Sequence, residues 1–457
     1  MNILIRNGII VTSTDRYRSD ILISDGKIKN IESGIKADSE DNVIDANGSY
    51  IFPGGIDPHV HMHLPSPAGY SSDDFLTGSK AALFGGTTTI IDFVTPFRGQ
   101  SLTDALTQRK KEAENSLIDY SFHVSPVEWR DTTEKEINDC ISAGITSFKV
   151  YMAYKDTTGL RDTDLFKVMK TVGNAGGIVA IHCESGDEIE ILRTKFFEDN
   201  CITPEFHSLS RPAESEATAV KKAIDLANQN NCLLYIVHVS SLNSLKHIEN
   251  ALNRGQKIYS ETCPQYLLLD ESKYSGDFHL TAPFIISPPL RKKADNEALW
   301  AAISQGTVNT VGTDHCPFFL TQKERGINDF RKIPNGAGGV EHRLGLLYTY
   351  GFLENRITIN RLVDIFATMP AKIFGLYPSK GDLSVGSDAD LVIWNPDSEN
   401  TISAKTHHQN CDINIFEGIK TKGNAEYVIA GGKIVIKKGE LADSPIRGQF
   451  IKRSICV

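Results

Sequence analysis

The sequence predicts an α/β protein in which a (β/α)₈ barrel lies between two β-rich ends. Apolar strand-like runs alternate with helix-like stretches over roughly 300 residues in the middle of the chain, which predicts a parallel sheet covered on both faces. Short alternating apolar runs occupy residues 1–50 and return in 390–394 and 426–436. A length of 457 residues suits one large barrel with a smaller domain. A doubly wound sheet is the alternative.

The N-terminal segment has the texture of a small antiparallel sheet. Runs such as Ile3-Leu4-Ile5 and Ile21-Leu22-Ile23 are separated by Gly8, Gly26 and Gly48. Because the same texture returns near the C-terminus, we expect the two ends to pair into one domain. The expected divisions are an N-terminal part at 1–52, the barrel at 53–380, the C-terminal part of the small domain at 381–440 and a tail at 441–457 that is a candidate for subunit contact.

Polar residues mark the ends of several expected barrel strands. The strand-like runs of the middle region are 87–93, 120–124, 147–151, 178–182, 233–238 and 308–314. Lys149, His182, His238 and Asp314 each lie in, or at the end of, a different one of these runs. Because the C-terminal ends of barrel strands converge on one mouth, we expect these four residues to meet there.

The stretch from Gly54 to His63 carries two histidines two residues apart, His59 and His61. On a strand this spacing places both imidazoles on one face, which suits a divalent metal ion. An isolated pair of this kind can be incidental, but histidines also end two near-identical apolar runs elsewhere, which favours a metal site. Asp314 could be a helix N-cap; beside four histidines it is better interpreted as a ligand and a base.

Lys149 lies inside an apolar strand, where a lysine is costly to bury unless it is paired or chemically changed. One alternative is a side chain that reaches solvent along its aliphatic stem. The other is a neutral, nucleophilic amine that takes up CO₂ as a carbamate. A carbamate is an anionic oxygen ligand that can bridge two cations.

Composition excludes several classes of partner. The net charge of −9 and the lack of a long basic run argue against nucleic acid or a membrane surface as partner. There is no apolar stretch of membrane-spanning length and the N-terminus lacks signal-peptide features, so we expect a cytoplasmic protein. The eight cysteines include no C-x-x-C pair, which argues against disulfides and thiolate-bound zinc.

Several motifs together resemble the dihydropyrimidinase/hydantoinase family of cyclic amidohydrolases, nearly end to end. The motifs that carry the resemblance are Pro53-Gly54-Gly55-Ile56-Asp57-Pro58-His59-Val60-His61, Gly85-Gly86-Thr87-Thr88-Thr89-Ile90-Ile91-Asp92-Phe93, 147–154, 235–240, Glu261-Thr262-Cys263-Pro264-Gln265-Tyr266-Leu267, Ser287-Pro288-Pro289-Leu290-Arg291, Thr313-Asp314-His315-Cys316-Pro317-Phe318 and Pro334-Asn335-Gly336.

The resemblance implies a (β/α)₈ barrel with a composite β-sandwich from both termini, a homotetramer, and two divalent metal ions, usually Zn²⁺. One metal would be bound by His59, His61 and Asp314. The other would be bound by His182 and His238, with N-carboxylated Lys149 as the bridging ligand. By the same resemblance, Tyr154 contacts the substrate and the oxyanion, and Ser287 and Asn335 hold a cyclic ureide largely through backbone groups.

The implied reaction opens a dihydropyrimidine or 5-substituted hydantoin ring to an N-carbamoyl amino acid, with Asp314 transferring the proton. One departure is Ser66, in the loop Met62–Tyr70, where the family commonly has Phe. The resemblance therefore does not predict which substituent the substrate ring carries. His63 stands where dihydroorotases carry arginine, which disfavours that activity. Allantoinase is the alternative within the class. The non-enzyme alternative is an inactive assembly protein on the same fold, which the complete ligand set disfavours.

Overall fold

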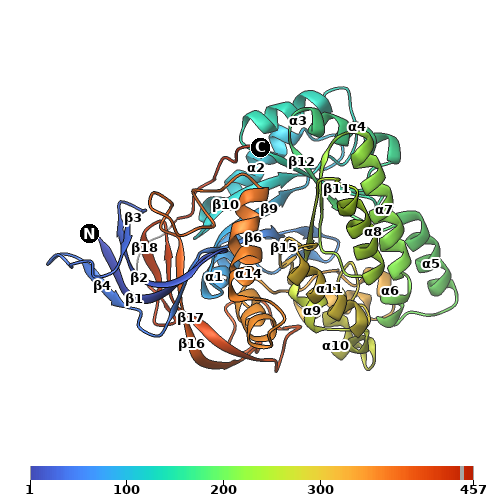
Figure 1. Cartoon of the computed structure of the whole chain (residues 1–457). Helices are drawn as coiled ribbons and strands as arrows, with labels where there is room; N and C mark the ends of the chain where they lie inside the picture. The colour runs from blue at the N-terminus through green and yellow to red at the C-terminus, as the bar shows by residue number, and fades with distance from the viewer. Residues whose placement is uncertain (1, 443–446, 456–457) are drawn as a thin grey trace.

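The computed structural model describes residues 2–442 and 447–455 and contains two large sheets. Figure 1 shows one lobe built from both ends of the chain beside a larger lobe of strands and surrounding helices. The larger lobe is an eight-stranded parallel sheet, which confirms the predicted (β/α)₈ barrel. In spatial order its strands are β6 (Gly55–Val60), β9 (Thr87–Val94), β10 (Asp119–Val124), β11 (Ser147–Tyr151), β12 (Ile178–His182), β13 (Leu233–Ile236), β14 (Ile258–Thr262) and β15 (Thr310–Val311).

Helices follow the barrel strands and cover their outer face. All eight residues of β9 are buried, as expected of a strand packed on both sides. The first covering helix begins after Asp74, whose carboxylate accepts hydrogen bonds from the backbone N–H of Leu76 and Thr77 at 2.9 and 2.8 Å. The covering helices are α1 (Phe75–Phe84), α2 (Leu102–Glu112), α3 (Thr133–Ser142), α4 (Asp162–Asn174), α7 (Ala213–Gln229), α8 (Leu242–Asn253) and α11 (Lys293–Gln305).

The barrel closes between β6 and β15 with few ladder bonds. The backbone N–H of His61 donates to His315 O at 2.8 Å, and Val60 forms a parallel bridge with His315. Below this contact, the buried guanidinium of Arg343 donates from Nη1 to Ile56 O at 2.8 Å and to Val311 O at 3.0 Å. Because the sheet closes on itself, the doubly wound alternative is wrong.

The second sheet joins the two ends of the chain, as predicted. Strand β5 (Tyr50–Pro53) pairs antiparallel with β16 (Leu391–Thr401), and Ile51 faces Ile393 in that register. Apolar side chains from both ends form a separate core cluster. The other strands are β1 (Ile3–Val11), β2 (Arg16–Ser24), β3 (Lys27–Glu32), β4 (Asn42–Asp45), β17 (Lys420–Ala430), β18 (Lys433–Lys437) and β19 (Glu440–Leu441). The exact domain boundaries stay predictions.

Lys380 connects the two lobes. Its ammonium lies 2.8 Å from Asp119 at the start of β10, and 3.4 Å from Asp388 beside the second sheet. It also forms an ion pair with Asp390, immediately before β16. Burial disfavours the charged lysine, but these carboxylates outweigh that effect and raise its pKa. The two lobes therefore share a buried charge cluster.

The described part of the C-terminal tail packs against its own barrel. The N–H of Tyr120 donates to Gln449 O at 3.0 Å, and the N–H of Ile451 donates to Tyr120 O at 2.8 Å. Arg453 donates from Nε to Ser121 Oγ at 2.9 Å and from Nη2 to Phe122 O. The tail thus lies near the N-terminal ends of the barrel strands. Contact of the tail with a second subunit stays a prediction.

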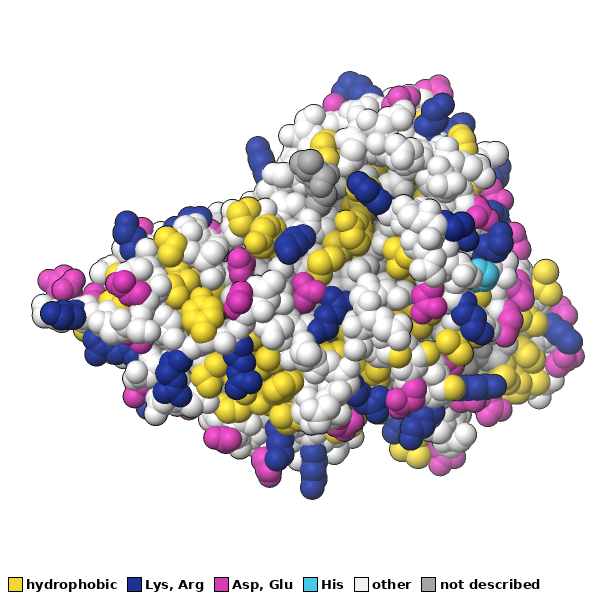
Figure 2. Space-filling model, viewed as in Figure 1, with side chains coloured by type: hydrophobic (Ala, Val, Ile, Leu, Met, Phe, Trp, Pro, Cys, Tyr) yellow, Lys and Arg dark blue, Asp and Glu magenta, His cyan; other side chains and the backbone are white. Residues whose placement is uncertain are grey.

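The surface gives no sign of segregated charge on the face that Figure 2 shows, where basic and acidic side chains are interspersed. Among the described residues, no helix combines the length and the apolar character needed to cross a membrane.

Candidate metal centre and active site

One cavity of about 710 Å³ lies at the C-terminal ends of the barrel strands. It is lined by residues from seven of the strands or from the segments that follow them, including the entrance loop after β6. All the residues predicted from the sequence as ligands, bases or substrate contacts line this cavity: His59, His61, Lys149, Tyr154, His182, His238, Ser287, Asp314 and Asn335. The structure therefore brings the whole predicted set together.

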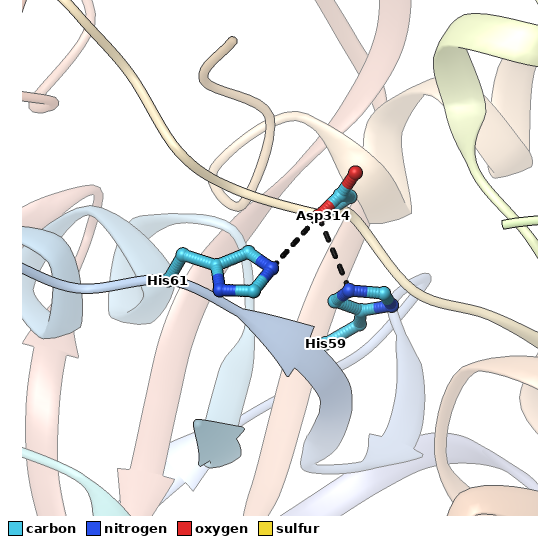
Figure 3. A group of neighbouring side chains, drawn as sticks. All are labelled: His59, His61 and Asp314. Carbon is cyan, nitrogen blue, oxygen red and sulfur yellow. Dashed lines mark ion pairs between the residues drawn. The ribbon is translucent and has the colours of Figure 1, made fainter. Parts of the chain in front are cut away.

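The His59, His61 and Asp314 side chains form a tight group at the mouth of the barrel (Figure 3). Oδ1 of Asp314 lies 3.2 Å from His59 Nε2 and 3.1 Å from His61 Nε2. Burial raises the pKa of Asp314, but the two imidazoles lower it more, so it stays well below its usual range. Two nitrogens and a carboxylate oxygen at this separation are a donor set that divalent zinc accepts.

A buried carboxylate fixes the orientation of His59. Glu261, in β14, lies with Oε1 2.6 Å from His59 Nδ1, and its Oε2 accepts a hydrogen bond from Tyr235 at 2.7 Å. Burial lowers the pKa of His59, yet Glu261 and Asp314 outweigh it and raise the pKa to about 9. His59 Nε2 is buried, and although Asp314 Oδ1 lies 3.2 Å away, the two atoms are not aligned as a hydrogen bond. This orphaned nitrogen, facing a carboxylate, fits a bound cation.

The second histidine pair is arranged in the same way. His182 Nδ1 and His238 Nε2 lie 2.9 Å apart, and His182 Nε2 lies 2.7 Å from Glu184 Oε2. Burial lowers the pKa of both histidines, so both are neutral near pH 7. A hydrogen bond from Nε2 to Glu184 leaves the Nδ1 lone pair of His182 directed at His238. Two neutral imidazole nitrogens this close together are a donor pair that a divalent cation accepts.

Glu184 is held in its ionised form by a buried arginine. Arg211 Nη1 lies 2.6 Å from Glu184 Oε2, and both side chains are at most 2% exposed. Burial raises the pKa of Glu184, but Arg211 and then His182 reverse this and hold it at about 2. The Arg211 guanidinium also lies 5.5 Å from the centre of the Tyr154 ring. The carboxylates of Glu184 and Glu261 and this arginine were not assigned a role by the sequence analysis.

Lys149 lies on the floor of the cavity and is 1% exposed, so its side chain does not reach solvent. Its Nζ lies 5.1 Å from the ring centres of both Phe93 and Tyr151. Burial lowers the pKa of the ammonium to about 8, and Asp314 and Glu261 only partly oppose this. The lowered pKa increases the neutral fraction of the amine over that of an exposed lysine, and the neutral amine is the form that reacts with CO₂.

Three of the cavity residues hold strained backbone conformations. Tyr154, His238 and Asp314 have φ values of 58°, 38° and 52°, which non-glycine residues rarely adopt. After Tyr154 the chain turns sharply, and Arg98 donates to the carbonyls of Lys155 and Thr157 in that turn at 3.0 and 3.1 Å. All three of these residues line the cavity. Two other lining residues contact each other: Asn335 Nδ2 donates to Ser287 Oγ at 3.0 Å.

The entrance loop after β6 forms one rim of the cavity. It contains the short hairpin β7 (Pro65–Ser66) and β8 (Gly69–Tyr70), in which Ser66 Oγ donates to Gly69 O at 2.6 Å. Gln322 holds the hairpin from outside by donating to Tyr70 O at 2.8 Å. His63 stacks on Tyr70, with 4.0 Å between the ring centres, and is not among the residues that line the 710 Å³ cavity.

The chain matches known proteins over its full length. The model of the amidohydrolase family matches residues 50–435. A D-hydantoinase of Geobacillus stearothermophilus is 44% identical, over 99% of this chain and 97% of that protein. A dihydropyrimidinase of Arabidopsis thaliana is 37% identical, over 98% of this chain and 85% of that protein. The crystal structure of a dihydropyrimidinase from Brevibacillus agri superposes with a TM-score of 0.97 at 40% identity and covers 100% of both chains. The chain therefore belongs to the dihydropyrimidinase and hydantoinase family of amidohydrolases.

Proposed function

We propose that this enzyme hydrolyses a ring amide bond of a dihydropyrimidine or a 5-substituted hydantoin and releases an N-carbamoyl amino acid. The observation that carries the proposal is the convergence of four histidines, an aspartate and a buried lysine in one cavity at the strand ends. The names of the similar proteins support this class of ring. From the family resemblance we also propose a homotetramer that acts in the cytoplasm.

We further propose that the cavity holds two divalent cations, most simply Zn²⁺. His59, His61 and Asp314 would hold one, His182 and His238 the other, and Lys149 would bridge them as its carbamate. When bound, such cations supply water of lowered pKa and polarise a carbonyl group. The orphaned nitrogen of His59 and the lowered pKa of Lys149 support this assignment.

The chain's own groups account for the remaining chemistry. Asp314 takes the proton of the attacking water and delivers it to the ring nitrogen as the C–N bond breaks. The Tyr154 hydroxyl donates a hydrogen bond to the oxygen on which negative charge develops. Ser287 and Asn335, which line the same cavity as Tyr154, hold the ureide. Water thus adds hydroxide to the carbonyl carbon and a proton to the leaving nitrogen.

The test measures ring opening of dihydrouracil, 5-monosubstituted hydantoins, allantoin and dihydroorotate, with metal content determined on the same sample. We expect turnover of dihydrouracil or the hydantoins with about two metals per chain. Intact-protein mass spectrometry should show one added CO₂ that Lys149→Met abolishes. Activity confined to allantoin would make the enzyme an allantoinase, and inertness towards all four rings at full metal occupancy would overturn the proposal.

A matched pair of histidine variants separates the metal site from a general effect of losing imidazole. His59→Ala should lose both metal and turnover because it removes an orphaned ligand nitrogen. His279→Ala alters a half-exposed histidine whose partner is Glu324, at 2.9 Å, and should retain both.

A further inference from the structure

Lys323 is a fully buried lysine whose ammonium is surrounded by backbone carbonyls. It ends the short helix α12 (Leu320–Lys323), and its side chain is 0% exposed. Its Nζ donates to Ile285 O at 2.9 Å, to Pro334 O at 2.8 Å and to Gly336 O at 2.8 Å. These three bonds use all three protons of the ammonium.

The three carbonyls belong to the two loops that carry the predicted ring contacts. Ile285 lies two residues before Ser287, while Pro334 and Gly336 flank Asn335 on either side. Two further bonds join the same loops, from Gly336 N to Ile285 O at 3.0 Å and from Asn335 Nδ2 to Ser287 Oγ at 3.0 Å. Lys323 is the charged member of this set of connections.

Burying a charged lysine at this position costs free energy, because the ammonium loses its hydration. Burial lowers its pKa to about 7, and the titratable groups that oppose this are only the thiols of Cys316 and Cys411. An apolar side chain of the same length would avoid the desolvation of an ammonium. It would, however, leave three buried carbonyls with fewer partners and release the spacing between the loops.

We propose that Lys323 is a positioning residue for ring binding, which sets the distance between the loop of Ser287 and the loop of Asn335. The inference rests on the proposed function, because it takes these loops as the ureide-binding wall. Lys323 itself does not line the cavity, so it acts through the loops and not on the substrate. The metal ligands lie on other elements and keep their own hydrogen bonds without it.

The test compares wild type and Lys323→Met as metal-loaded enzymes on dihydrouracil and a 5-monosubstituted hydantoin. We expect KM to rise roughly tenfold or more for both rings, with kcat changed less than about threefold and metal content unchanged. Lys323→Gln keeps two N–H donors on a shorter side chain, so its KM should lie between the KM of wild type and that of Lys323→Met. Lys332→Met is the control, because that lysine is 70% exposed and its ammonium lies 3.5 Å from Asp329 at the surface.

The outcomes separate this inference from the proposed function. A wild-type enzyme that opens neither ring overturns both. With an active wild type, an unchanged KM in folded Lys323→Met overturns the role of Lys323, and so does a parallel loss of kcat and metal, which marks general damage. If the Met variant does not fold, Lys323→Gln decides: an elevated KM with wild-type metal content supports the role, and a wild-type KM contradicts it.

Discussion

At the scale of single residues, the candidate site is built from pairs in which a carboxylate orients an imidazole. Glu261 contacts the Nδ1 of His59, and Glu184 contacts the Nε2 of His182, so each histidine presents its other nitrogen to the cavity. Carboxylates that contact a ligand histidine both orient its imidazole ring and raise its affinity for a metal ion.

We expect Glu184→Gln to weaken metal binding by roughly 10- to 100-fold. A neutral amide oxygen accepts the hydrogen bond of His182 Nε2 more weakly than the carboxylate does, so the imidazole is held less firmly. Competition with a chromophoric chelator measures this directly. Glu188→Gln, on the exposed first turn of α5 (Gly186–Glu198), is the matched control and should bind metal as wild type does. If Glu184→Gln bound metal within twofold of wild type, the orienting role would be contradicted. A twofold change is about 0.4 kcal/mol of binding free energy, which is within the range of neutral surface substitutions.

The residues that line the cavity could be predicted from the sequence, but the residues that orient them could not. His182, His238, Lys149 and Asp314 were recognisable because each lies at or near the end of an apolar run, and strand ends meet in a barrel. Glu184 lies in a loop two residues after a ligand, where its contact with Arg211, 27 residues on, has no local signature. Long-range pairs of this kind follow from the packing of loops and not from the periodicity of strands.

At the scale of elements, two strands end earlier than their apolar runs. The run 233–238 forms a strand only over Leu233–Ile236, and the run 308–314 only over Thr310–Val311. In both cases the chain then reaches a residue with positive φ, His238 at 38° and Asp314 at 52°. Apolar character predicted the strands, because both faces are buried. It could not predict where the backbone leaves the ladder to direct a ligand inwards.

The short β15 leaves the barrel seam dependent on Arg343. We expect Arg343→Met to lower the free energy of unfolding by about 3 kcal/mol, because two buried carbonyls of the seam lose a charged donor. Urea denaturation measures the change. Arg254→Met alters an exposed arginine at the end of α8 and should shift the free energy by less than about 0.5 kcal/mol. Equal stability of the two variants would show that the seam does not need the guanidinium.

At the scale of the whole molecule, the two ends of the barrel have separate tasks. The cavity lies at the C-terminal ends of the strands, whereas the tail residues 447–455 contact the chain near their N-terminal ends. The candidate site is therefore spatially separated from the contacts that anchor the tail. This division agrees with the general organisation of (β/α)₈ enzymes.

Arg453→Ala tests that separation. It removes donors to Ser121 and Phe122 at the base of β10, so we expect the free energy of unfolding to fall by about 2 kcal/mol. The kcat and KM of the folded enzyme should stay at wild-type values, because the cavity lies at the other end of the strand. Lys452→Ala, on the exposed neighbouring side chain, is the control for stability. A loss of kcat/KM in folded, metal-loaded Arg453→Ala would contradict the division.

The carbonyl cage around Lys323 has a consequence for the medium in which the enzyme works. Three backbone oxygens at 2.8 to 2.9 Å from one cationic atom resemble the oxygen shell that replaces water around a potassium ion. Here the cation is covalently part of the chain and cannot exchange with the solution. The loops of Ser287 and Asn335 thus share a donor that is built into the chain, and we expect their spacing to be the same in sodium and potassium salts.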